Sequence, residues 1–114
     1  EGELRSGMIL AMQGEYALYL YGASATRGRE SMSTYALQWH AIRYARAAGC
    51  TEYDLSGIPD DANPSHPMHG LLRFKLGFGG HHVVRRGCWD YPLLEDEYPR
   101  YAGFELTDSG YHHA

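Results

Sequence analysis

The sequence predicts a mixed α/β domain, because it combines a hairpin signal, one strongly periodic helix, and strand-like segments separated by helices. Residues 4–12 and 16–21 are strand-like runs on either side of a short turn, so we expect them to form an antiparallel hairpin. Strands that a helix separates usually pair in parallel through a crossover. The expected order is therefore β-β-α-β-α-β, with a mixed sheet.

Length and composition are those of one globular domain with one hydrophobic core. The 114 residues are 44% hydrophobic and carry a net charge of −4, which favours neither a disordered chain nor a strongly basic nucleic-acid binder. The longest apolar runs are too short to span a bilayer, so we expect no integral membrane segment. The chain starts at Glu1 and not at methionine, so we expect a fragment of a longer protein.

The second strand, residues 16–21, contains alternating tyrosines. Its two-residue period places Ala17, Tyr19 and Tyr21 on one face of the sheet and Tyr16 on the other. A tyrosine in an alternating strand more often packs than takes part in chemistry. Packing is therefore the plainer interpretation of Tyr19 and Tyr21.

Residues 35–48 form the clearest helix of the sequence. One of the hydroxyl residues Ser31, Ser33 and Thr34 is expected to cap its start, and Gly49 to be the C′ residue that ends it. Its apolar side chains recur at helical spacing and predict the face that packs on the sheet. They are Leu37, Ala41, Ile42, Tyr44, Ala45 and Ala48.

Three further elements complete the domain. Residues 50–58 predict a third strand, which Gly57 and Pro59 end. Residues 67–76 predict a second helix, and residues 81–91 predict a last strand.

The remaining residues are acidic and aromatic without a clear period. We therefore expect one domain over residues 1–93 and an irregular tail over residues 94–114, with a short docked segment at residues 101–106.

Lys75 stands out because it is the only lysine among ten Lys and Arg residues. It follows Arg73 and Phe74 at the end of the second helix, just before a glycine-rich stretch. An ammonium on a flexible stem can reach a phosphate or stabilise a developing oxyanion. The alternative is a surface lysine that the helix dipole favours near a helix C-terminus.

Several stretches, in this order and spacing, resemble one family. They are Tyr19-Leu20-Tyr21-Gly22-Ala23-Ser24, Tyr35-Ala36-Leu37-Gln38-Trp39-His40-Ala41-Ile42-Arg43-Tyr44-Ala45, Tyr53-Asp54-Leu55-Ser56-Gly57-Ile58-Pro59, Gly70-Leu71-Leu72-Arg73-Phe74-Lys75-Leu76-Gly77-Phe78-Gly79-Gly80 and Tyr91-Pro92-Leu93. Together they resemble the C-terminal part of the Fem family, the aminoacyltransferases that form the interpeptide bridges of peptidoglycan. The resemblance covers residues 7–93 and leaves out the tail.

The resemblance implies a partial GNAT-like acyltransferase domain, the second of two such domains. Members of the family move an amino acid from an aminoacyl-tRNA to an amine on the stem peptide of a peptidoglycan precursor, and this needs no cofactor. The implied partners are the acceptor end of the tRNA, a lipid-linked or UDP-linked precursor, and the missing N-terminal GNAT-like domain. The implied location is the cytoplasm, including the inner face of the membrane.

The resemblance also implies site residues. The Phe74-Lys75 pair matches the place in the family that meets the aminoacylated tRNA end, and Arg73 lies beside it. Lys75 would be catalytic, together with a tyrosine on the strand before the long loop. Both Tyr19 and Tyr21 match that tyrosine.

Two other functions fit parts of the sequence. The first is an acetyl-CoA-dependent acyltransferase, but such enzymes hold the pyrophosphate with a Gly-rich turn that leads into a helix. The corresponding loop here, residues 25–34, has Gly28 as its one glycine. The second is a half-domain without catalytic activity that serves as a binding module.

The remaining candidate side chains favour structural roles. His66 and His69 lie three residues apart, and His81 and His82 are adjacent, but no Cys or carboxylate stands at ligand spacing. We therefore expect no metal. Asp54 lies within a strand, where we expect it to accept backbone or tyrosine hydrogen bonds and not to act as a general base.

Overall fold

The computed structural model describes residues 2–59, 63–87 and 89–107. The chain forms two compact units, Glu1–Gly57 and Ile58–Ala114, and each is described by itself.

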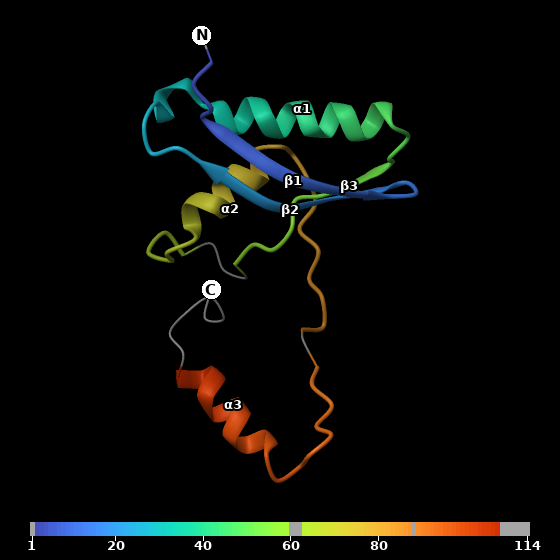
Figure 1. Ribbon diagram of the computed structural model, residues 1–114, viewed down its shortest axis with the longest axis vertical. Helices are drawn as coiled ribbons and strands as arrows, with labels where there is room; N and C mark the ends of the chain where they lie inside the picture. The colour runs from blue at the N-terminus through green and yellow to red at the C-terminus, as the bar shows by residue number, and fades with distance from the viewer. Residues whose placement is uncertain (1, 60–62, 88, 108–114) are drawn as a thin grey trace. The chain divides into compact units, whose positions relative to one another are not determined.

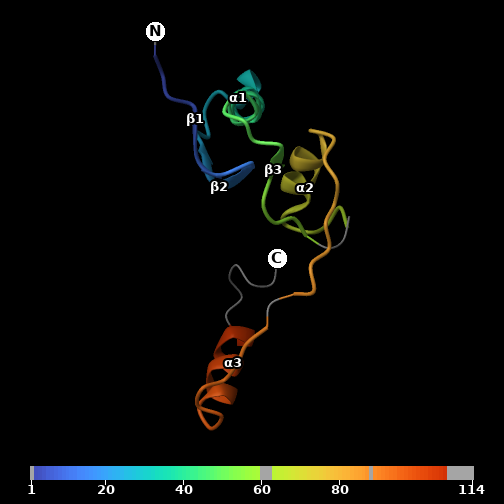
Figure 2. The same cartoon turned by 90° about the vertical axis from the view of Figure 1, so that its right-hand side faces the viewer.

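The first unit is a three-stranded sheet with one long helix. Its strands are β1 (Ser6–Gln13), β2 (Tyr16–Ser24) and β3 (Glu52–Asp54), in the order β1-β2-β3, and its helix is α1 (Ser33–Ala47). β1 and β2 are antiparallel, whereas β2 and β3 are parallel, so the predicted hairpin and the predicted parallel pair are both confirmed. Figures 1 and 2 show that α1 runs along one face of the sheet. The predicted mixed α/β class is therefore correct.

The core of this unit is made mostly of small side chains. Ala41 and Ala45 of α1 and Ala17 of β2 are buried, and Gln38 of α1 is buried with them. Small side chains let a helix approach a sheet closely. The predicted apolar face is only partly right, because the large ring of Tyr44 is 56% exposed and the polar Gln38 faces inward.

The sequence predicts the C-terminal end of α1 correctly but not its N-terminal cap. Gly49 has φ 98°, so the predicted C′ glycine is confirmed. The predicted hydroxyl cap is wrong, because Met32 is the N-cap and no side chain caps the helix. The Ser31 hydroxyl instead donates to the carbonyl oxygen of Gly28, 2.7 Å away, within the short 3-10 helix η1 (Arg29–Ser31) that precedes α1.

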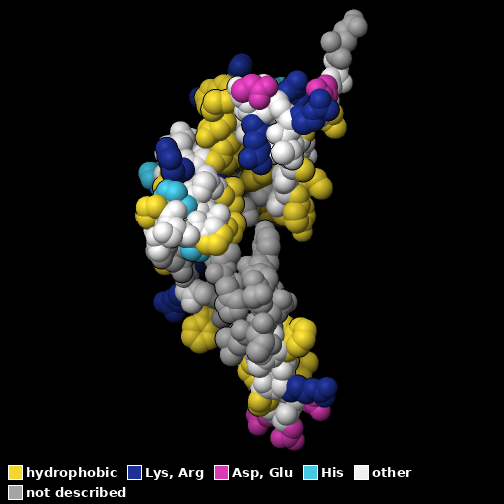
Figure 3. Space-filling model, turned by 90° about the vertical axis from the view of Figure 1, so that its left-hand side faces the viewer, with side chains coloured by type: hydrophobic (Ala, Val, Ile, Leu, Met, Phe, Trp, Pro, Cys, Tyr) yellow, Lys and Arg dark blue, Asp and Glu magenta, His cyan; other side chains and the backbone are white. Residues whose placement is uncertain are grey.

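The second unit contains two helices, α2 (His69–Leu76) and α3 (Tyr98–Thr107). α2 confirms the predicted second helix, although it starts two residues later than expected. α3 lies in the segment expected to be an irregular tail, so that segment is more regular than its sequence indicates. Tyr101 and Phe104 of α3 are exposed, and Figure 3 shows apolar surface along this segment.

The predicted last strand is wrong. The described residues of 81–91 form no strand, and Val83, Val84 and Trp89 are each more than 70% exposed. β-branched and aromatic residues favour strands because they pack on a half-buried pleated surface, and that requires a neighbouring strand. The local sequence therefore predicted a strand, but no strand in the described part of the chain pairs with this segment.

In the described ranges, no helix has both the length and the apolar character needed to cross a membrane.

Candidate functional site

A β-bulge in β2 separates the two candidate tyrosines. Tyr19 pairs with Leu10 of β1, whereas Tyr21 pairs with the adjacent Ile9, so Leu20 is an extra residue in β2. Since adjacent residues of a strand point to opposite faces, Tyr19 and Tyr21 lie on opposite faces of the sheet. The predicted common face for the two tyrosines is therefore wrong.

Tyr19 lies on the face that α1 covers, and Tyr21 does not. Tyr19 is two residues from the buried Ala17 and is half-buried itself, whereas Tyr21 is 69% exposed. Burial raises the pKa of the Tyr19 phenol above its usual value. Of the two candidates, Tyr19 is the one in a defined environment.

The bulge also moves Gly22 onto the face of Tyr19. Gly22 pairs with Met8, which is two residues from Leu10, the partner of Tyr19. A Cβ atom at position 22 would overlap the Tyr19 hydroxyl oxygen and lie 2.7 Å from Cζ of the same ring. The Tyr19 ring therefore extends along β2 and fills the space that Gly22 leaves.

Two polar residues that the sequence did not single out accompany Tyr19. Gln38 is only 1% exposed, and its Nε2 donates a hydrogen bond to the Tyr53 hydroxyl, 2.7 Å away. Tyr53 pairs with Ala17, so it lies on the same face of the sheet as Tyr19. A polar residue in the apolar stripe of α1 was the one available signal, and glutamine is too common on helix surfaces for that signal to be specific.

The pKa of Tyr53 reflects this environment. The pKa of the Tyr53 phenol is raised from 10.0 to about 12, first by burial and second by the nearby Tyr19, while the Gln38 hydrogen bond acts in the opposite direction. Tyr53 is therefore a neutral hydrogen-bonding group at physiological pH.

In the second unit, α2 carries the other predicted residues. Lys75 is only 6% exposed, one turn from the buried Leu72, whereas Arg73 is exposed. The alternative interpretation of Lys75 as a surface lysine at a helix end is therefore wrong. A buried ammonium is costly unless charged or polar groups surround it, and for this reason buried lysines are often functional.

Phe74 is half-buried and packs against Phe78, which follows α2. The two ring centroids are 5.3 Å apart and the ring planes meet at 82°, an edge-to-face contact. Gly79, with φ 79°, follows this pair and turns the chain after the helix. The Phe-Lys pair thus lies at a well-defined helix end, with Arg73 on the same turn.

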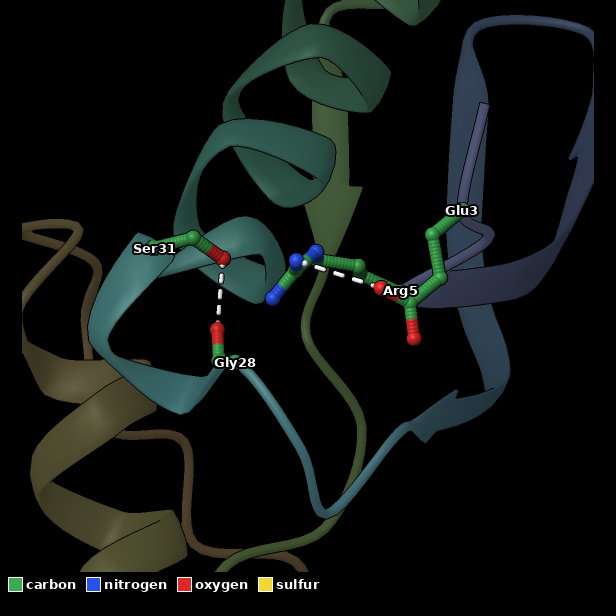
Figure 4. A network of polar contacts seen from close by, with 4 residues as sticks. All are labelled: Glu3, Arg5, Gly28 and Ser31. Atoms are coloured by element: carbon green, nitrogen blue, oxygen red, sulfur yellow. Dashed lines mark hydrogen bonds and ion pairs between the residues drawn. The ribbon is translucent and has the colours of Figure 1, made fainter. Parts of the chain in front are cut away.

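The loop before α1 is held by an arginine from the segment before β1. The Arg5 guanidinium lies against Gly28, where a Cβ atom would overlap its Nη1, and it pairs with Glu3 at 3.3 Å (Figure 4). The Arg5 carbonyl oxygen accepts a hydrogen bond from the Ala25 amide, 2.7 Å away. This arginine thus covers the one glycine of the loop that a CoA pyrophosphate would need to approach.

Asp54 has the structural role predicted for it. Its carboxylate accepts hydrogen bonds from the Tyr16 hydroxyl at 2.5 Å and from the Ser56 amide at 2.6 Å.

Within the described ranges, no three His, Cys, Asp or Glu side chains are grouped so that they could hold a metal ion. The expectation of no metal stays a prediction.

The structure brings two sets of residues together, one in each unit. Gln38 and Tyr53 are hydrogen-bonded to each other in the first unit, and Tyr19 lies on the same face of the sheet as Tyr53. Arg73, Phe74 and Lys75 share the last turn of α2 in the second. The catalytic and binding roles expected for Tyr19, Tyr21, Arg73, Phe74 and Lys75 stay predictions.

Comparisons with known proteins agree on one family. The model of the FemAB family matches residues 4–105. The chain is 34% identical to the Lipid II:glycine glycyltransferase of Staphylococcus aureus (strain USA300) over 98 residues. These aligned residues make up 86% of this chain and 23% of the relative. The Staphylococcus epidermidis enzyme of the same name is also 34% identical over 98 residues, 86% of this chain and 24% of that relative.

No solved structure matches the chain. The chain spans about a quarter of the length of the curated relatives it matches. Because the family model covers most of the sequence, including β1, α1, α2 and most of α3, the chain belongs to the FemAB family.

Proposed function

We propose that the protein is an aminoacyltransferase that moves an amino acid from an aminoacyl-tRNA to an amine on the stem peptide of a peptidoglycan precursor. The observation that carries this proposal is the FemAB match over residues 4–105. The name of the relatives, Lipid II:glycine glycyltransferase, supports a lipid-linked precursor as the acceptor and glycine as the first amino acid to assay.

The proposed reaction is the aminolysis of an ester. The acceptor amine attacks the carbonyl carbon of the aminoacyl ester, a tetrahedral oxyanion forms, and the ribose hydroxyl of the tRNA leaves. No covalent intermediate on the enzyme is needed. The protein contributes by aligning two large substrates and by stabilising the negative charge that develops.

The residues at the end of α2 suit the tRNA side of this reaction. The Lys75 ammonium would stabilise the oxyanion or the terminal phosphate, and its burial supports this role because electrostatic interactions are stronger away from water. The half-buried Phe74 ring would stack on the terminal adenine. The exposed Arg73 would contact the phosphate backbone.

Tyr19 would donate a hydrogen bond to the ester carbonyl. Its half-buried position supports this role over Tyr21, whose side chain is 69% exposed, and its hydroxyl can donate this hydrogen bond.

An aminoacyl-tRNA donor and a lipid-linked acceptor are both accessible where the cytoplasm meets the membrane. We propose that the protein acts there, at the inner face of the membrane and without a cofactor.

The test is transfer of radiolabelled glycine from glycyl-tRNA to detergent-solubilised lipid II by the full-length protein. We expect Lys75→Met to lower kcat about 100-fold or more, because one charged donor to an oxyanion commonly has that effect. The melting temperature should stay near that of the wild type, since methionine fills a similar volume without the charge. Lys75→Arg keeps a charge in a different shape and should also be impaired.

The control is Arg43→Met, which removes an exposed cation from α1 in the other unit and should leave transfer within about twofold of the wild type, as expected for an exposed surface substitution. Transfer that is unchanged in both Lys75 variants would remove Lys75 from the mechanism. Wild-type protein that transfers no amino acid but is stabilised by CoA would indicate the acetyltransferase alternative instead. Binding of the substrates without any transfer would indicate a binding module.

A further inference from the structure

The strongest unexplained feature of the first unit is a polar side chain at the centre of its core. Gln38 is the largest fully buried side chain among the described residues, on a helix face whose other buried members are alanines. Burying an amide is costly unless it is hydrogen-bonded, and a leucine or methionine would fill the same space. The Gln38 amide therefore has a use that packing does not explain.

The hydrogen bond from Gln38 restricts the orientation of the Tyr53 hydroxyl. Because Nε2 donates to the Tyr53 oxygen at 2.7 Å, the hydroxyl hydrogen of Tyr53 has to point elsewhere. Tyr53 lies opposite Ala17 in the parallel pair of β2 and β3, and Tyr19 is the next residue of β2 on that face. The two phenols interact electrostatically, as the effect of Tyr19 on the pKa of Tyr53 indicates.

The hydroxyl end of the Tyr19 ring lies against Gly22. The bulge at Leu20 places Gly22 on the face of Tyr19, and the hydroxyl occupies the space that any larger residue at position 22 would fill. The hydroxyl is thereby directed toward the C-terminal end of β2.

We propose that Gln38, Tyr53 and Gly22 are positioning residues for Tyr19. Gln38 and Tyr53 restrain the phenol from the side of α1 and β3, and Gly22 leaves the space into which its hydroxyl extends. The reactive role of Tyr19 rests on the proposed function, whereas its placement by these three residues does not.

The position of the Tyr19 ring can be measured without an activity assay, by NMR of the full-length protein labelled with ¹³C at the tyrosine Cζ atoms. Gly22→Ala should shift the Tyr19 signal, because the new methyl group displaces the end of a flexible side chain. Gln38→Met should shift both the Tyr53 and the Tyr19 signals. Gly7→Ala is the matched control, since a Cβ atom at this β1 position meets nothing within 4 Å, and it should leave both signals in place. A Tyr19 signal that is unmoved in Gly22→Ala and Gln38→Met would overturn the proposal.

The consequence for transfer is measured by a double-mutant comparison. Gly22→Ala and Gln38→Met should each lower kcat about tenfold with little change in KM, because a small displacement of a reacting group affects the chemical step most. In a Tyr19→Phe background neither should have any further effect, whereas a role confined to fold stability would lower activity in both backgrounds.

The outcomes separate this inference from the proposed function. Losses that persist in full in the Tyr19→Phe background would overturn the positioning role, even if the wild-type protein transfers glycine. Wild-type protein without transfer would refute the proposed function, and the NMR signals alone would then decide the placement of Tyr19.

Discussion

At the scale of single residues, Asp54 shows how a carboxylate in a strand can be structural. It belongs to β3, and its two oxygens accept hydrogen bonds from Tyr16 of β2 and from the backbone amide of Ser56. Ser56 has φ 66°, a conformation that a non-glycine residue adopts only when other contacts hold it. Asp54 therefore ties the parallel strand pair together and fixes the turn that follows β3.

We predict that Asp54→Ala lowers the free energy of unfolding by about 1 kcal/mol, because it removes two hydrogen bonds and leaves the Ser56 amide without its partner. The measurement is urea denaturation followed by circular dichroism. Tyr16→Phe removes only one of the two hydrogen bonds and should have a smaller effect. An Asp54→Ala protein as stable as the wild type would contradict this structural role.

At the scale of elements, α1 connects the antiparallel hairpin to the parallel strand. Its C-terminal end is fixed by Gly49 at φ 98°, after which the Thr51 and Glu52 amides both bond the carbonyl oxygen of Glu15. The left-handed residue thus reverses the chain and delivers β3 to the edge of β2. A helix with the same apolar face but without the left-handed Gly49 at its end would not bring β3, and with it Tyr53, beside Tyr19 of β2.

We predict that Gly49→Ala lowers the free energy of unfolding by about 1 kcal/mol, through backbone strain alone. A Cβ atom at position 49 meets nothing within 4 Å, so no steric clash contributes. Gly70→Ala is the matched control within α2, where a Cβ atom also meets nothing, and it should raise stability by up to about 1 kcal/mol. Chemical denaturation of both variants checks that the free energy of unfolding falls in Gly49→Ala and rises in Gly70→Ala. The same change in both variants would refute the strain argument.

At the scale of the whole molecule, the chain divides its chemistry between two compact units. The first contains the sheet and α1 with Tyr19, Gln38 and Tyr53, and the second contains α2 with Lys75, followed by α3. The unit boundary at Gly57 lies after β3. The expected division into a domain over residues 1–93 and a tail over 94–114 stays a prediction.

We predict that the stability of the folded protein falls above pH 10. The pKa of Tyr53 is about 12 in the folded chain against 10.0 ordinarily, so between these values the unfolded state loses the proton first and unfolding is favoured as the pH rises. Below pH 10 this contribution is fully present. Urea midpoints measured from pH 8 upward should decline beyond pH 10, and the decline should be shallower in Tyr53→Phe. An equal decline in both proteins would show that Tyr53 does not cause it.

The sequence by itself determined the features that rest on local patterns. Alternation and turn residues predicted the hairpin, helical periodicity predicted α1 and its end at Gly49, and the order of these stretches predicted the family. These signals are readable because each depends on residues close together in the chain.

Only the tertiary structure decided which side chains meet. The extra residue in β2 appears only when Tyr19 and Tyr21 are paired with β1, and it moves Tyr21 off the face of Tyr19. The burial of Gln38 and Lys75 depends on what packs around them, and both residue types are usually found on helix surfaces. The predicted strand at residues 81–91 failed for the same reason, since a strand exists only where another strand completes its hydrogen bonds.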